Sequence, residues 1–139
     1  MMYRELKELQ DRYTSLCRMI FDSAGDFSFQ QVAQNDGSPH VEFDGTAFHM
    51  VTTERGLELS RQTTRDEDDI LFWMVRDASF WAAVRYELEN RVNAQDSRRI
   101  IFKEWRRLVA KCGGKFAERL DAEIDTILNE NPYTDGGSI

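Results

Sequence analysis

One segment, residues 70–88, constrains the fold of this 139-residue chain more than any other, because its helical pattern places apolar side chains on nearly every side. A helix of this kind needs neighbouring elements around it, so we expect it to be central and buried. The capping-box pattern Thr64-Arg65-Asp66-Glu67 marks its start, and the acids that continue to Asp69 suit the positive end of a helix dipole. The rest of the chain must supply the layers that cover it.

The other patterns supply helices and strands for those layers. Apolar residues at three- and four-residue steps predict a helix that ends before Gly25. Asp44-Gly45 and Arg55-Gly56 are turn signals between short alternating segments, which predicts a three-stranded antiparallel β-meander. Two amphipathic helices follow, one beginning at Asp96 and one after Gly113-Gly114.

Together these elements predict an α+β fold: an N-terminal helix, a three-stranded antiparallel β-meander, and a three-helix C-terminal layer with a buried central helix. A chain of this length can build one core, so we expect a single domain over residues 1–139. Three strands cannot hide an apolar face alone, and a helix layer is expected to cover it. The expected boundaries are residues 1–23 for the first helix, 40–63 for the meander, 64–131 for the helical layer and 132–139 for the tail.

The charge of the chain is acidic and segregated. Eighteen Lys and Arg residues against 25 Asp and Glu residues leave a net charge of −7, which argues against general nucleic-acid binding. Residues 97–115 carry a net charge of +6, whereas residues 66–96 and residues 116–139 each carry −5. Two interpretations stay open: acidic helices that partly pair with a basic one, or an acidic surface that docks a basic partner.

A small group of charged residues falls among apolar ones in the helical layer. Asp77 shares a helix face with Trp73, and a buried carboxylate needs a charged or hydrogen-bonding partner. Glu87 and Arg91 are spaced to pair along one helix, and Arg98 lies toward the apolar side of the next. Asp77, Glu87, Arg91 and Arg98 therefore form either an internal network that locks two helices together or a polar cleft that receives part of a partner.

No catalytic, metal or cofactor site is expected. The chain has no glycine-rich phosphate loop and no nucleophile elbow, and His40 and His49 fall on neighbouring strands without a Cys or a paired carboxylate. Cys17 and Cys112 lie on apolar helix faces, which is typical of packing thiols in a reduced compartment. Without an apolar run of about 18 residues or a secretory-signal layout, we expect a cytoplasmic protein with no membrane partner.

A series of motifs begins in the second half of the meander. The motifs lie at residues 53–56, 63–73, 77–82, 86–91, 95–102, 116–119 and 131–133. The order and spacing of Trp73, Asp77, Phe80 and Arg91 within them are more specific than any single residue. Over residues 47–135 the sequence resembles the immunity protein 63 family of bacterial polymorphic toxin systems. It departs from the family at Asn93-Ala94, where we expect a turn containing glycine, and at Ser97, where we expect an aromatic residue.

The resemblance implies a non-enzymatic cytoplasmic protein that binds a cognate toxin domain and blocks it. Such an inhibitor needs a rigid scaffold and a charged surface matched to its target. Two alternatives stay open: an interaction or regulatory module without a toxin, and a cation-dependent nucleotide hydrolase, whose carboxylate pairs only Glu118-x-x-Asp121 matches clearly. The expected docking residues are Asp66, Glu67, Asp68 and Asp69, with Glu118, Asp121 and Asp125 second.

Overall fold

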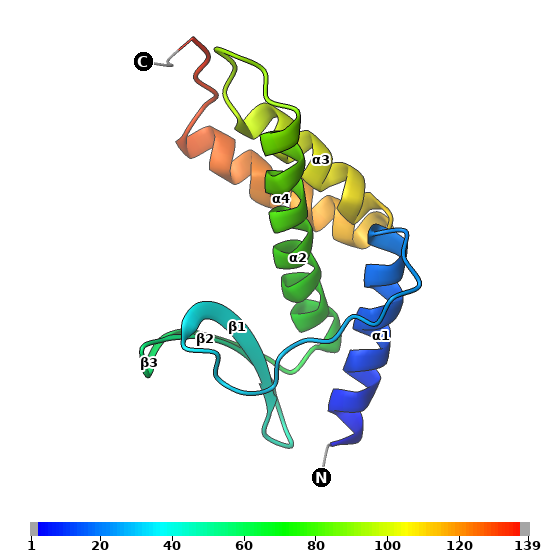
Figure 1. Cartoon of the computed structure of the whole chain (residues 1–139). Helices are drawn as coiled ribbons and strands as arrows, with labels where there is room; N and C mark the ends of the chain where they lie inside the picture. Colours follow the sequence, from blue (N-terminus) through cyan, green and yellow to red (C-terminus); the bar gives the residue numbers. More distant parts are fainter. Residues whose placement is uncertain (1–2, 137–139) are drawn as a thin grey trace. The chain divides into compact units, whose positions relative to one another are not determined.

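The computed structural model describes residues 3–136, and its elements follow the expected order of one helix, three strands and three helices (Figure 1). The α+β architecture predicted from the sequence is confirmed. Residues 1–2 of the predicted first helix and residues 137–139 of the predicted tail lie outside the described residues. The elements are α1 (Arg4–Ile20), β1 (Asp36–Phe43), β2 (Phe48–Glu54), β3 (Leu57–Thr64), α2 (Glu67–Glu89), α3 (Arg98–Ala110) and α4 (Gly114–Glu130).

The three strands form one antiparallel sheet in the order β1-β2-β3. The turn between β2 and β3 is the expected one, because Arg55 and Gly56 have φ values of 52° and 80°, the two positive values that a type I′ turn requires. The turn between β1 and β2 lies one residue later than predicted. Gly45 has a φ of 96°, whereas Asp44 uses its carboxylate to accept the N–H groups of Thr46 and Ala47.

Strands β1 and β2 have buried residues on both faces. The register places Val41 opposite Met50 on one face and His40 opposite Val51 on the other, and all four side chains are buried. The connector before β1 contributes to this packing: its Asn35 N–H donates to the buried Thr53 hydroxyl at 3.0 Å. Both faces of these two strands are therefore buried.

Strand β3 does not have that cover. Every residue from Leu57 to Thr63 is exposed, and the side chains of Leu57 and Leu59 are 68% and 56% exposed. The cover expected over the apolar face of the meander therefore does not extend to β3. Its sequence, LELSRQTT, gives the physical reason: after the two leucines it offers only polar side chains, so a covering layer would bury little apolar area.

Helices α3 and α4 pack against each other, side by side in Figure 1. Trp105 also ties α3 to α2, because its indole N–H donates to the Arg76 carbonyl at 3.0 Å and its ring meets Phe80 edge to face. The buried apolar residues of the two helices are Phe102, Trp105, Leu108, Val109, Phe116, Leu120 and Ile124.

Helix α2 is the buried central helix of the prediction along its first part. Ile70, Leu71 and Phe72 are all fully buried. Its second part differs from the expectation, since Trp81 is 65% exposed and Leu88 is 61% exposed. The pattern that is apolar on nearly every side therefore leaves one stripe of the later turns in contact with solvent.

The described chain consists of two compact units. The first comprises α1 to Arg18, the connector, the sheet and α2 to Met74; the second comprises residues 19–21 and the chain from Val75 onward. Helix α2 thus contributes its first turns to one unit and its remaining turns to the other. The single domain expected from the sequence stays a prediction.

Candidate functional site

An arginine of α1 binds the acidic first turn of α2. The Arg12 guanidinium donates to Glu67 Oε1 and to Asp68 Oδ1, each at 2.8 Å, and the bond to Glu67 is the main cause of a raised Arg12 pKa. The contacts differ from the predicted capping box: the Thr64 hydroxyl accepts the N–H of Asp66 at 3.0 Å rather than that of Glu67, and the Glu67 carboxylate is held by Arg12. Two of the four acids of this turn are therefore already bound by one arginine of the same chain.

Asp66 and Asp69 complete this turn. Asp66 is exposed, and its Oδ1 accepts the Asp68 N–H at 2.9 Å, as a helix cap does. Asp69 Oδ2 accepts the Thr64 hydroxyl at 2.8 Å. The four predicted residues Asp66, Glu67, Asp68 and Asp69 thus lie together at one accessible helix start.

The predicted acids of the last helix lie opposite the basic helix. Arg106 Nε donates to Asp121 Oδ1 at 3.1 Å, and another nitrogen of the same guanidinium lies 3.9 Å from Asp125 Oδ1. Asp125 keeps 73% of its side chain exposed, and Glu118 is exposed as well. Of the three predicted acids of α4, Asp121 is therefore hydrogen-bonded by Arg106, whereas Glu118 and Asp125 stay open to a partner.

The four residues of the predicted polar network occupy three separate ion pairs. Glu87 and Arg91 do pair, at 3.0 and 3.1 Å, and Glu87 is buried. Asp77 instead pairs with its neighbour Arg76 at 3.2 Å, and its side chain is 40% exposed. Burial raises the pKa of Asp77, and the Arg76 guanidinium opposes that rise. Asp77 therefore lies at the edge of the apolar face, where a neighbouring residue on its own helix can reach it.

Arg98, the fourth member, holds the C-terminal segment against the start of α3. Its guanidinium donates to Asp96 Oδ2 at 2.8 Å and to the carbonyls of Asn131 and Pro132 at 2.8 and 2.9 Å. Asp96 also accepts the Thr134 N–H at 2.9 Å. Two of the sequence motifs, residues 95–102 and residues 131–133, are therefore brought together by this clamp.

Arg99 and Tyr133 strengthen the same clamp. The Arg99 guanidinium lies 4.3 Å from the centre of the Tyr133 ring and pairs with Asp135 at 2.8 Å. The hydrogen bonds from Arg98 are the main reason that the pKa of Asp96 is held well below its usual range. A structural role, holding the C-terminal segment against α3, therefore accounts for these motif residues without a ligand.

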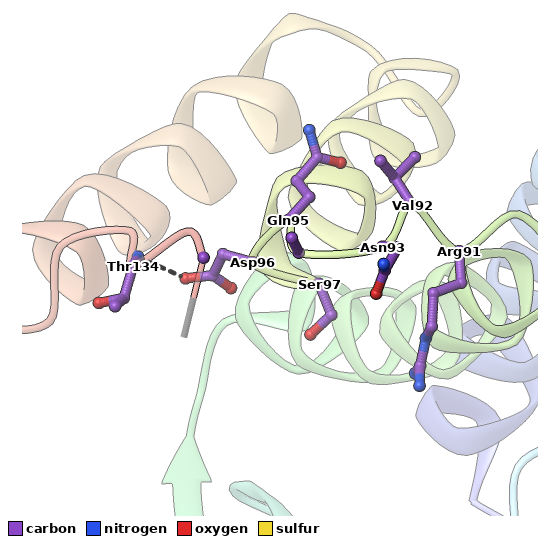
Figure 2. Close-up of a pocket in the computed structure, with 9 residues that line it drawn as sticks. Arg91, Val92, Asn93, Gln95, Asp96, Ser97 and Thr134 are labelled. Carbon is purple, nitrogen blue, oxygen red and sulfur yellow. Dashed lines mark hydrogen bonds between the residues drawn. The ribbon is translucent and has the colours of Figure 1, made fainter. Parts of the chain in front are cut away.

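The loop between α2 and α3 borders a hollow of about 540 Å³ (Figure 2). Ala94 within it has a φ of 62°, at the place where the sequence analysis expected glycine. Its carbonyl accepts the Gly136 N–H at 2.6 Å, so the strained turn also helps to hold the tail. The lining residues are Arg91, Val92, Asn93, Ala94, Gln95, Asp96, Ser97, Thr134 and Gly136.

A second hollow, of about 500 Å³, lies between α2 and α3 and contains a buried acid that sequence reasoning missed. Glu104 is only 9% exposed, and Arg107 binds both of its oxygens at 2.7 Å. Arg107 belongs to residues 97–115, the basic segment of the sequence. The spacing of Glu104 and Arg107 by three residues on a helix was a signal that could have identified the pair.

The histidines form hydrogen bonds with nearby polar side chains. His40 Nε2 lies 2.7 Å from Glu42 Oε2, and His49 lies 2.8 Å from both Asp44 Oδ2 and Thr63 Oγ1. Within residues 3–136, no three His, Cys, Asp or Glu side chains gather as a metal-binding group. Burial raises the pKa of the Cys17 thiol, which suits a packing role. None of the helices that the structure describes is long and apolar enough to cross a membrane.

A family model described as immunity protein 63 matches residues 44–126, which is more than half of the chain. The match begins at the first turn of the meander and ends in α4, so it includes β2, β3, α2 and α3 completely. No curated protein and no solved structure matches the chain.

Proposed function

Because the chain belongs to the immunity protein 63 family, we propose that it binds a cognate bacterial toxin domain in the cytoplasm and neutralises it. The family match is the single observation that carries this proposal. The predicted site residues form ion pairs within the described part of the chain. This suits the proposal, because an inhibitor that blocks a toxin by binding needs no catalytic group of its own.

The proposed docking surface is the first turn of α2, with the acids of α4 second. Its support is accessibility and charge: Asp66 is exposed at the helix start, and Glu118 and Asp125 are exposed on α4. Acidic surfaces speed association with a basic partner and limit it to partners of complementary charge. Arg12 and Arg106 reduce the excess charge but also fix the positions of the carboxylates that they bind.

Co-expression tests the proposal. The C-terminal domain of the toxin encoded beside this chain's gene is expressed from an inducible promoter, with and without the full chain. Survival only in the presence of the chain is expected. An inactivated toxin domain is the control for the burden of expression, and purified chain and toxin domain should elute together from a sizing column.

Death of the cells in the presence of well-expressed chain would contradict the proposal. Survival without a stable complex would contradict it too, because it would point to a mechanism other than binding.

A further inference from the structure

The later turns of α2 expose a stripe of apolar side chains. Trp81 and Leu88 lie seven residues apart, or two helical turns, so they share one side of the helix, and they are 65% and 61% exposed. Val92 follows the end of the helix and is 51% exposed. All three residues belong to the second compact unit, so the stripe is a surface of that unit alone.

The stripe contributes little to the core of the unit. The opposite side of the same helix carries the fully buried residues Ser79 and Ala83. The Trp81 ring meets the Phe80 ring edge to face, with 5.5 Å between the ring centres, and most of the indole stays in contact with solvent. Clustered exposed apolar side chains, with a tryptophan among them, are typical of a protein interface. The stripe therefore indicates a surface that a partner covers.

Two charged residues accompany the stripe. Arg85 lies within it and Glu89 follows by one turn, and both side chains are exposed. Neither side chain has a hydrogen bond or an ion pair with another residue in the described range 3–136. The nearby charges of Glu87 and Arg91 bind each other. The stripe thus offers one cation and one acid for pairing, and these two charges cancel.

This arrangement is complementary to itself. When two copies of a helix pack antiparallel about a two-fold axis, residue i of one copy meets residue j of the other, and j meets i. With the axis near residue 87 of α2, Arg85 of each copy lies opposite Glu89 of the other. Trp81 of each copy then reaches the end of the other α2, where Val92 is exposed. One symmetric packing therefore forms two ion pairs and covers the apolar side chains of both copies.

Other occupants match the stripe less well. Two parallel α2 helices would place Arg85 against Arg85, and like charges in contact disfavour association. A toxin surface at this place would need the reverse order of charges, which nothing in this chain specifies, whereas a second copy carries that order in its own sequence. Because the two charges cancel, the stripe also has no electrostatic preference for a basic protein. These observations favour a second copy.

We propose that two copies of the chain form a dimer by packing α2 against α2 antiparallel, with Arg85 of each copy bound to Glu89 of the other. The inference goes beyond the proposed function, because it concerns contact between two copies of this chain. From Trp81 to Leu88 the stripe covers about 12 Å of helix, which places the interface at the small end of specific interfaces. We therefore expect a dissociation constant in the micromolar range.

Leucine substitutions test the apolar part of the interface. Leu88→Ala removes the same exposed side chain from both copies and is expected to weaken dimerisation by about tenfold or more. Sedimentation equilibrium over micromolar to millimolar concentrations measures the effect. Leu59→Ala is the matched control: Leu59 is 56% exposed but lies on β3, in the other compact unit, so its loss should leave dimerisation unchanged.

Charge reversals test the antiparallel register. Arg85→Glu and Glu89→Arg should each weaken dimerisation by about tenfold, because each brings like charges together at both pairs. An equimolar mixture of the two variants should form heterodimers of nearly native affinity, since every carboxylate then faces an arginine again. Pairing of Arg85 with Glu89 inside one helix would not produce this recovery on mixing.

Oxidation of the native chain by hydroxyl radicals gives a measurement that does not depend on the folding of a variant. Trp81 should become protected as the protein concentration rises through the dissociation constant. Met19, which is 49% exposed on α1, is the internal reference and should keep its rate of oxidation.

A native chain that stays monomeric over this range, or mixed charge variants that associate no better than either alone, would overturn the inference. Unchanged oxidation of Trp81 would overturn it too. A monomeric chain whose binding of the toxin domain is weakened by Leu88→Ala and not by Leu59→Ala would assign the stripe to the toxin and also overturn the inference. None of these results alters the co-expression experiment, on which the proposed function depends.

Discussion

At the scale of single residues, the loop before α3 shows how a local departure from a family pattern appears in the structure. Ala94 has a positive φ, which costs an L-residue with a side chain about 1 kcal/mol or more. Asp96, two residues later, accepts bonds from Arg98 and from the Thr134 N–H. The turn is therefore strained at Ala94 and held in place by the hydrogen bonds of Asp96.

Replacing Ala94 with glycine should stabilise the protein. Glycine adopts a positive φ without strain, although its greater freedom in the unfolded chain offsets part of the gain. We expect Ala94→Gly to raise the free energy of unfolding by about 0.5 kcal/mol, as measured by urea denaturation. Ala94→Val should lower it, because a β-branched side chain tolerates this region least. A destabilised glycine variant would contradict the strain.

Asp96 should make stability depend on pH in the acid range. Its pKa in the folded protein is lowered, chiefly by Arg98, so its contribution is present above the unfolded value near 4 and is lost as the pH falls toward the folded value. Asp96→Asn should lower the free energy of unfolding by about 2 kcal/mol near pH 6. The difference from the native chain should shrink as denaturation is repeated toward about pH 3. A difference independent of pH would contradict the role of the charge.

At the scale of elements, α2 and α3 each bury one glutamate and bind it with an arginine one turn later. Glu87 is 3% exposed in its side chain while Arg91 is 61% exposed, and Glu104 and Arg107 repeat this arrangement. In both pairs the arginine guanidinium binds the buried carboxylate and stays in contact with water. The helices therefore carry their buried charges without a partner from another element.

Removing Arg91 should cost more than removing Asp77. Arg91→Ala leaves the buried Glu87 carboxylate unpaired, and we expect a loss of roughly 2–3 kcal/mol, softened because water can replace an exposed guanidinium. Asp77→Ala removes a half-exposed pair and should cost less than about 1 kcal/mol. Thermal and urea unfolding of both variants measure the contrast. The double variant Glu87→Gln, Arg91→Ala should recover part of the loss, and an equal cost for both single variants would contradict the argument.

At the scale of the whole molecule, the chain has a net charge of −7, and many of its acids form ion pairs with arginines. Arg12 binds the start of α2, and Arg106 binds α4. Pairing between the basic segment and an acidic helix is therefore present for α3 and α4, whereas the cation at the start of α2 comes from α1. The interpretation of an acidic docking surface stays a prediction for the acids that are left exposed.

Charge reversal tests whether the acidic start of α2 guides association. If the start of α2 guides a basic toxin domain, Asp68→Lys should slow association and reduce its dependence on salt, because it removes a favourable charge and frees Arg12 from one of its two carboxylates. Stopped-flow association at two salt concentrations measures both effects. Glu8→Lys, an exposed reversal on α1 with the same change of net charge, is the control. An unchanged association rate for Asp68→Lys would remove this surface from the proposal.

The sequence by itself determined the order and type of the elements. Helical periodicity and turn residues act over a few positions, so the meander, the buried start of α2 and the α3–α4 pair followed from local patterns. The Glu87–Arg91 pair followed for the same reason, because four residues on a helix form one turn. The exposed Trp81 shows the limit of such patterns: periodicity gives the face of a residue but not what lies against it.

Only the tertiary structure decided which charges are already paired and which apolar side chains are exposed. Arg12 and Glu67 are 55 residues apart, and Arg98 and Asn131 are 33 apart, so no local spacing relates them. Long side chains reach partners that depend on where whole elements lie, and an apolar side chain stays exposed only if no other element covers it. For this reason the acidic helix start was visible in the sequence, whereas its ion pairs with Arg12 and the exposed stripe of α2 were not.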